Sequence, residues 1–197
     1  MARKTSTPKQ KSAAQALARL EKGNDKFVTD ELSHELQDVS RRVDLKSGQW
    51  PWAVVLTCAD SRVVPELIFD TGIGELFVVR VAGNVANTSS MASIEYAVAN
   101  LDVKLIVVLG HEGCGAVKAA LDGKDLGYNL NHLLAHIKPA IDKPLKTKDR
   151  VTEAAERNAI STAQQLLDRS ECIGNARKLK VVPAIYRLAT GEVDYLA

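Results

Sequence analysis

Three uninterrupted apolar runs constrain the fold of this chain more than any other feature of its sequence. They cover residues 53–57, 76–81 and 105–109, are rich in β-branched side chains, and are bounded by turn-forming residues. A strand with one face in water alternates apolar and polar residues, and these runs do not alternate. They therefore predict strands that are buried on both faces of a parallel sheet.

Helical spacing of apolar residues supplies the segments that alternate with these strands. The first helix is predicted to end at Gly23-Asn24, and a later one begins at a pair of serines. Predicted helices cover residues 13–24, 90–101, 130–141 and 152–167. Strands that alternate with helices are typical of an α/β fold. We therefore expect a mostly parallel central β-sheet flanked by helices.

The two ends of the chain are expected to add an N-terminal helical arm and a C-terminal edge hairpin. Residues 1–11 lack apolar periodicity and contain several basic side chains, so they are predicted to be a mobile basic arm. Apolar segments at 181–188 and 193–196 flank a turn, which predicts a hairpin at the sheet edge. Pro183 favours an edge or bulge position there, because proline cannot donate a ladder hydrogen bond. Residues 12–197 are expected to form a single domain.

Composition excludes several classes of partner. With 197 residues, 46% hydrophobic and 25% charged, the chain is expected to form one globular domain. Its formal net charge of +2 gives no basic footprint for nucleic acid. No apolar run approaches the length of a membrane span or a signal peptide, so we expect no membrane partner and a cytoplasmic location. Three widely spaced cysteines do not form a disulfide framework and favour metal binding or catalysis.

Two short clusters follow the first and third apolar runs. One contains Cys58, Asp60 and Arg62, and the other contains His111 and Cys114. The carboxyl ends of neighbouring parallel strands meet at one edge of a sheet, where ligands bind in α/β folds. Zinc prefers sulfur and nitrogen ligands at tetrahedral geometry. The clusters therefore predict zinc on Cys58, His111 and Cys114, with the fourth position taken either by Asp60 or by water.

Two other interpretations would also account for cysteines at these positions. Cys58 and Cys114 could be buried core thiols with His111 a hydrogen-bonded loop residue, but two clusters at adjacent strand ends disfavour this. A catalytic cysteine is disfavoured because the segment from Cys58 to Arg62 is too short to cradle an anion. Arg62 can hold Asp60 by a bidentate ion pair that keeps the carboxylate off the metal and ready to accept a proton from metal-bound water. The same pair could also be an ordinary salt bridge that ties a loop.

At these residues the sequence resembles the β-class carbonic anhydrases. The matching motifs are Cys-Ala-Asp-Ser-Arg-Val at 58–63 and His-Glu-Gly-Cys-Gly-Ala at 111–116, and the similarity extends over most of the chain after residue 11. The resemblance implies a Zn²⁺ cofactor on the three ligands, with Asp60 and Arg62 as the catalytic dyad and Asp60 binding zinc only in a closed state. It further implies substrate contacts from Gln49, Phe77, Tyr96 and Gly115. Part of this pocket comes from a partner subunit in the family, which implies a homodimer or tetramer.

The activity implied by the resemblance is the reversible hydration of carbon dioxide to bicarbonate and a proton through zinc-bound hydroxide. Hydrolysis of carbonyl sulfide or carbon disulfide on the same scaffold is one alternative. A zinc-binding module without turnover, in which Asp60 permanently closes the metal site, is another. The sequence leaves the roles of His132, His136 and Cys172 open.

Overall fold

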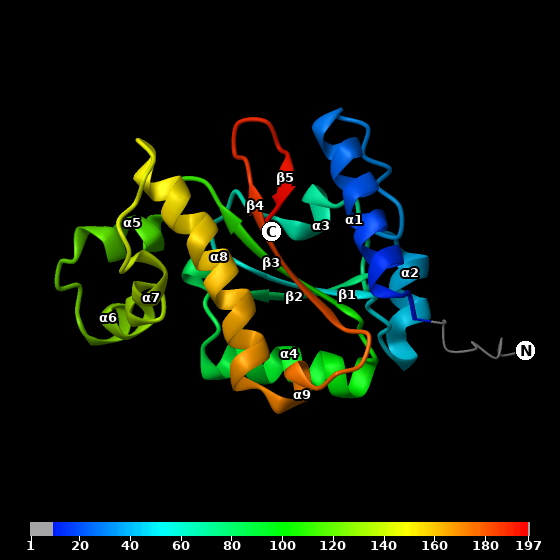
Figure 1. Cartoon of the computed structure of the whole chain (residues 1–197). Helices are drawn as coiled ribbons and strands as arrows, with labels where there is room; N and C mark the ends of the chain where they lie inside the picture. The colour runs from blue at the N-terminus through cyan, green and yellow to red at the C-terminus, as the bar shows by residue number, and fades with distance from the viewer. Residues whose placement is uncertain (1–9, 197) are drawn as a thin grey trace, which may run out of the picture.

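The centre of the molecule is a five-stranded β-sheet, seen in a computed structural model that describes residues 10–196 (Figure 1). The strands are β1 (Ala53–Thr57), β2 (Leu76–Arg80), β3 (Leu105–His111), β4 (Lys180–Tyr186) and β5 (Val193–Tyr195). Their order is β2-β1-β3-β4-β5, with β1 to β4 parallel and β5 antiparallel to β4. The mostly parallel sheet and the edge hairpin are therefore confirmed.

Helices cover both faces of this sheet. They are α1 (Ala13–Val28), α2 (Val39–Asp44), α3 (Pro65–Ile68), α4 (Thr88–Leu101), α5 (Gly115–Asp122), α6 (Tyr128–Ala135), α7 (Lys138–Ile141), α8 (Arg150–Arg169) and α9 (Glu171–Gly174), with 3₁₀ turns η1 (Leu45–Ser47) and η2 (Ala82–Asn84). Figure 1 shows α1 and α3 on one side of the sheet, α4, α8 and α9 on the other, and α5 to α7 gathered beyond one end. Among the residues from 10 to 196, no helix is long and apolar enough to cross a membrane.

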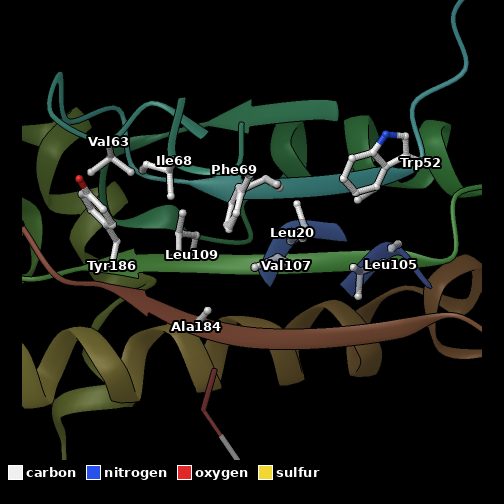
Figure 2. Packing of buried hydrophobic residues seen from close by; sticks show 13 residues of the cluster. Leu20, Trp52, Val63, Ile68, Phe69, Leu105, Val107, Leu109, Ala184 and Tyr186 are labelled. Carbon is white, nitrogen blue, oxygen red and sulfur yellow. The ribbon is translucent and has the colours of Figure 1, made fainter. Parts of the chain in front are cut away.

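The core lies on both faces of the two central strands, β1 and β3. Because strand side chains alternate in direction, Val107 packs with Leu20 and Phe69 on the α1 and α3 face (Figure 2), while Ile106 packs with Leu166 on the α8 face. Every residue of β1 and β3 is buried. The expectation of full burial is wrong for β2, which is partly exposed because it forms one edge of the sheet.

The predicted end of the first helix at Gly23-Asn24 is wrong, since α1 continues to Val28. Both residues are buried, Gly23 by a close contact with α3 and Asn24 by hydrogen bonds to other parts of the chain. A Cβ atom at Gly23 would lie 1.9 Å from the carbonyl oxygen of Phe69, so only glycine lets α1 pack this closely on the end of α3. The Asn24 amide donates to the carbonyls of Ile68 and Gly191 and ties the helix to the C-terminal hairpin.

Two other predicted elements have different bounds. The helix expected over 130–141 is divided into α6 and α7, because Pro139 has no N–H and its ring would clash with the carbonyl of Ala135 in a continuous helix. The strand expected to end at residue 109 continues through His111. This residue therefore belongs to the central strand of the sheet and not to the following loop.

The ends of the described chain lie against the sheet and its helices. The predicted mobile arm falls mostly on residues 1–9, which lie outside the described part of the chain. Gln10 is described, and its amide donates to the carbonyls of Pro51 and Leu101 at 3.1 and 2.7 Å. At the other end, the Pro183 carbonyl accepts from the amide of Leu196, on the side of β4 that faces away from β3. Its missing N–H therefore costs no hydrogen bond to β3. The expected edge position is wrong, because β5 pairs beside β4 and forms the edge of the sheet.

Candidate metal centre

The two sequence clusters meet at the carboxyl edge of the sheet. Cys58 directly follows β1, His111 is the last residue of the neighbouring parallel strand β3, and Cys114 caps the N-terminus of α5. The Cys58 and Cys114 sulfurs are 3.9 Å apart. One ligand atom from each of the three residues lies within 4.8 Å of the other two, and all three residues are buried. They form the only such group of three metal-capable side chains in the described part of the chain.

This geometry fits a tetrahedral metal ion. With zinc–sulfur bonds of about 2.3 Å, two tetrahedral thiolate ligands stand roughly 3.8 Å apart, close to the observed separation. His111 has its Nδ1 atom 2.8 Å from the carbonyl oxygen of Glu112, to which it donates. That hydrogen bond leaves the lone pair on Nε2, which is buried and has no hydrogen-bond partner among the described residues. A buried nitrogen without a partner is costly unless it binds a ligand, and this one faces two sulfurs.

The two thiols have opposite tendencies to ionise. The pKa of Cys58 is lowered, mainly because the Cys114 thiol donates a hydrogen bond to its sulfur. The pKa of Cys114 is raised, mainly because it is the donor in that bond and also because it is buried. The backbone amide of Gly83 donates a further hydrogen bond to the Cys58 sulfur, at 3.3 Å. One thiolate is therefore favoured before any metal binds, and a metal ion would displace the second proton.

Asp60 and Arg62 form the bidentate ion pair expected from the sequence. The Arg62 Nε and Nη2 atoms donate to the two Asp60 oxygens at 2.9 and 2.8 Å, and the Arg62 amide donates to Oδ1 at 3.0 Å. These hydrogen bonds hold the pKa of Asp60 far below its usual value. The carboxylate oxygen Oδ2 is 3.9 Å from Nε2 of His111, beside the group of three ligands but not part of it.

Arg80 is a site residue that the sequence did not single out. Its guanidinium donates to the carbonyl of Cys58 at 3.1 Å and to the carbonyl of Asp60 at 2.6 Å, which fixes the loop that carries both side chains. Arg80 ends β2, which is parallel and adjacent to β1. A basic residue at the carboxyl end of a neighbouring strand is the sequence signal that could have identified it.

The predicted pocket residues do not all gather at this edge. Gly115 follows Cys114 as the first residue of α5. Gln49 lies before β1, at the opposite end of that strand from Cys58. It lines a cavity of about 590 Å³ together with Tyr96 and Gln10. Phe77 lies on β2, with its ring centroid 6.5 Å from that of Tyr96. Within a single chain, the three metal-capable side chains therefore lie together with Asp60 and Arg62. Gln49 and Tyr96 line a separate cavity.

The remaining cysteine and histidines lie apart from this centre. The Cys172 sulfur is 3.8 Å from the carbonyl oxygen of Glu95. His132 and His136 are neighbours on α6, with ring centroids 5.5 Å apart. The pKa of His136 is lowered, first by burial and then by the charges of His132 and Arg169.

Comparison with known proteins gives one consistent result. The family model described as "Carbonic anhydrase" matches residues 53–193. The chain is 42% identical over 183 residues to "Carbonic anhydrase 2" of Mycobacterium tuberculosis, an alignment that covers 88% of this chain and 87% of that protein.

Solved structures agree. A β-carbonic anhydrase of Aspergillus fumigatus superimposes with a TM-score of 0.74 at 30% identity and covers 93% of this chain and 89% of its own. One of two tetrameric β-carbonic anhydrases of Sordaria macrospora gives a TM-score of 0.73 at 27% identity, with 89% of this chain and 94% of that chain covered. By sequence and by fold, the chain belongs to the β-class carbonic anhydrase family.

Proposed function

We propose that this protein catalyses the reversible hydration of carbon dioxide, with Zn²⁺ held by Cys58, His111 and Cys114. The observation that carries the proposal is the buried Nε2 atom of His111, which has no hydrogen-bond partner in the described chain and faces two sulfurs 3.9 Å apart. Two sulfurs and one imidazole suit zinc better than they suit hard cations. When bound, zinc supplies Lewis acidity, which makes a coordinated water acidic near neutral pH.

Asp60 and Arg62 have separate tasks in this proposal. Arg62 occupies both carboxylate oxygens of Asp60 and so holds the side chain away from the fourth metal position. Because its pKa is lowered by Arg62, Asp60 remains a carboxylate over the physiological range and can accept a hydrogen bond from the reacting water. The Arg62 side chain is 56% exposed, so a proton released beside the pair has a short path to solvent.

The pocket is proposed to be completed by a second copy of the chain. Gln49 and Tyr96 are expected to contact substrate, yet Gln49 lies at the amino end of β1, whereas Cys58 lies at its carboxyl end. Five strand residues span roughly 17 Å, which is too far for direct contact between Gln49 and a substrate beside Cys58. The solved relatives from Sordaria macrospora are tetrameric. A dimer or tetramer in which one subunit offers these residues to the site of another is the arrangement we infer.

Two alternatives make different predictions. Hydrolysis of carbonyl sulfide or carbon disulfide would use the same ligands and dyad. A non-catalytic zinc module would require Asp60 to close the metal site, and the ion pair with Arg62 argues against that state.

One experiment distinguishes these possibilities. We would measure zinc content and the rates of carbon dioxide hydration and carbonyl sulfide hydrolysis on the same preparation, over a range of pH. Stoichiometric zinc with carbon dioxide hydration is the expected result. Zinc with activity on carbonyl sulfide alone would favour the hydrolase, and zinc without activity at any pH would favour the non-catalytic module. A preparation that binds no zinc would refute the metal site.

A further inference from the structure

Asn158 is a buried polar residue on the mostly apolar face of α8. Its side chain is 1% exposed, and its neighbours on that face include Ala155, Ala159 and Leu166. Burying an amide group is costly unless it is hydrogen-bonded. The Nδ2 atom donates to the carbonyl of Gly83 at 2.7 Å, while Oδ1 has no partner in the described part of the chain. The hydrogen bond to Gly83 is therefore the interaction that compensates for burying the Asn158 side chain.

Gly83 belongs to a constrained turn, η2, beside the metal ligands. Gly83 and Asn84 have φ values of 68° and 45°, in the left-handed region that non-glycine residues rarely adopt. A Cβ atom at Gly83 would lie 2.7 Å from a side-chain carbon of Ile137, so the turn is tightly enclosed. Glycine adopts this conformation without strain, and the hydrogen bond from Asn158 fixes the turn to α8.

The two polar groups of Gly83 connect α8 to a metal ligand. Its carbonyl accepts from Asn158, and its amide donates to the Cys58 sulfur at 3.3 Å. An amide hydrogen bond withdraws electron density from a thiolate, so the sulfur donates less charge to a bound metal. This matters in a site with two thiolates, because strong thiolate donation weakens the Lewis acidity on which hydration depends.

We propose that Asn158 is a positioning residue for the metal centre, which acts through Gly83 to set the electron donation of the Cys58 thiolate. The inference rests on the proposed function, because it assumes that a metal binds at this site. It assigns to α8 a role that neither the ligands nor the Asp60–Arg62 pair supply.

Substitution of Asn158 tests the proposal through properties that a purely structural role would not change. Asn158→Leu removes the donor to Gly83 at similar volume, and Asn158→Ala removes it with a smaller side chain. We expect zinc affinity to fall about 10-fold to 100-fold, the usual range for loss of an outer-shell partner, because Cys58 is then held less firmly in its binding position. In the Co²⁺-substituted protein, the sulfur-to-cobalt charge-transfer bands should move to lower energy, because a thiolate without its donor releases an electron more readily.

A matched control is Thr162→Val, which changes another buried polar side chain one helical turn further along α8. Its zinc affinity and charge-transfer bands should equal those of the unmodified protein. Folded Asn158 variants with unchanged affinity and unchanged bands would overturn the proposal, even if they were less stable.

A measurement on the unmodified protein covers the case in which these variants do not fold. In the ¹¹³Cd-loaded, ¹⁵N-glycine-labelled protein, the Gly83 amide should show a scalar coupling to the metal through its hydrogen bond to the Cys58 sulfur. The amide of Gly123, which bonds to the carbonyl of Ala119, should show none. Bound cadmium without coupling at Gly83 would overturn this proposal alone. Failure of the protein to bind cadmium or zinc would refute the proposed metal site itself.

Discussion

Asp60 lies beside the three metal-capable side chains while Arg62 binds both of its oxygens, so the proposed function assigns metal binding and turnover to different residues. We expect Asp60→Asn to lower kcat/KM for carbon dioxide by about 100-fold or more, because the neutral amide loses the ion pair with Arg62 and offers the reacting water a weaker hydrogen-bond acceptor than a carboxylate. Zinc content should remain stoichiometric, because Asp60 is outside the ligand group. Stopped-flow hydration assays and metal analysis on one sample measure both properties.

Asp142→Asn is the matched control, since this carboxylate is exposed and distant in sequence from the site. Its activity should equal that of the unmodified protein. A fully active Asp60→Asn enzyme would contradict the assignment of the dyad, and a zinc-free one would show that Asp60 is needed for metal binding.

The meeting of three metal-capable side chains could be predicted from single residues, because cysteine and histidine are chemically distinctive metal ligands and these follow strand ends. The supporting contacts could not. Gly83 contributes only its backbone amide to Cys58, so no side chain in the sequence marks it. Asn158 lies far along the chain on a helix whose pattern predicts only amphipathic packing. Contacts of this kind depend on the tertiary fold, which residue patterns do not specify.

At the scale of elements, Asp70 joins α1 and the following loop to the end of α3. Its carboxylate is 3% exposed, pairs with Lys26 at 2.7 Å, and accepts from the amide and hydroxyl of Ser33. Burial alone would raise the pKa of Asp70, but the hydrogen bonds from Lys26 and Ser33 outweigh it and lower the pKa. A carboxylate with a lowered folded-state pKa adds stability above its unfolded pKa of about 4 and loses it as the pH falls further.

We therefore expect Asp70→Asn to lower the free energy of unfolding by about 1–3 kcal/mol at neutral pH. The difference from the unmodified protein should shrink as the pH falls from about 4 towards the lowered folded-state pKa, because the carboxylate is protonated first in the unfolded state and finally in the folded state as well. Urea denaturation of the metal-free proteins at several pH values measures it. The exposed Asp122→Asn serves as control, and a difference that grows in acid would contradict the linkage.

Arg187 connects three elements near the end of β3. Its Nη1, Nη2 and Nε atoms pair with Glu112, Glu156 and Asp194 at 3.2, 3.0 and 2.7 Å. Glu112 also accepts from the amide of Leu188, so the residue that follows the ligand His111 is held from two sides. The geometry uses three different nitrogens of one planar group, and lysine cannot reproduce that arrangement.

Arg187→Lys should therefore destabilise the protein by about 1–2 kcal/mol despite the conserved charge. At this chain length that corresponds to a fall in Tm of roughly 2–8 °C by calorimetry. Arg177→Lys is the control, because Arg177 is exposed and makes no ion pair in the described chain. An Arg187→Lys protein with unchanged Tm would show that a point charge is sufficient here.

Whether a segment forms a helix or a strand was predictable where a single demand, such as burial on both faces, determined its residues. The β-branched run 53–57 is buried on both sides and matches β1 to the residue. The predicted ends of helices and strands were wrong where a residue was selected by tertiary packing and not by local structure. Gly23 has the pattern of a helix end, but it provides the close contact with Phe69. Similarly, His111 looks like a loop residue because it is polar, although it ends the central strand with its ring fully buried.

At the scale of the whole molecule, the position of Gln49 predicts shared active sites. If Gln49 of one subunit contributes to the active site of another, each site combines Gln49 from one chain with Asp60 from the other. Gln49→Ala and Asp60→Asn then damage the same site from different chains. Co-expression of the two variants with different tags should yield mixed dimers that contain one intact site and regain a substantial part of the activity. An activity equal only to the average of the two parent variants would contradict shared sites.

The α/β class, the edge hairpin and the family could be predicted from sequence, because they depend on long apolar patterns and on two specific motifs. Assembly into a dimer or tetramer was predicted only through the resemblance, since Gln49 and Tyr96 by themselves carry no mark that relates them to a second chain. The cytoplasmic location and the basic arm over residues 1–11 stay predictions.

The origin of the ligands from β1 and β3 has a kinetic consequence. Cys58 and His111 are separated in sequence by β2 and α4, and they meet only when the two central strands are paired. An unfolded chain therefore offers no complete donor set, and metal capture follows the main folding barrier. Interactions that form after the transition state slow unfolding and leave the refolding rate unchanged. Bound zinc should therefore slow unfolding of the protein and leave its folding rate unchanged.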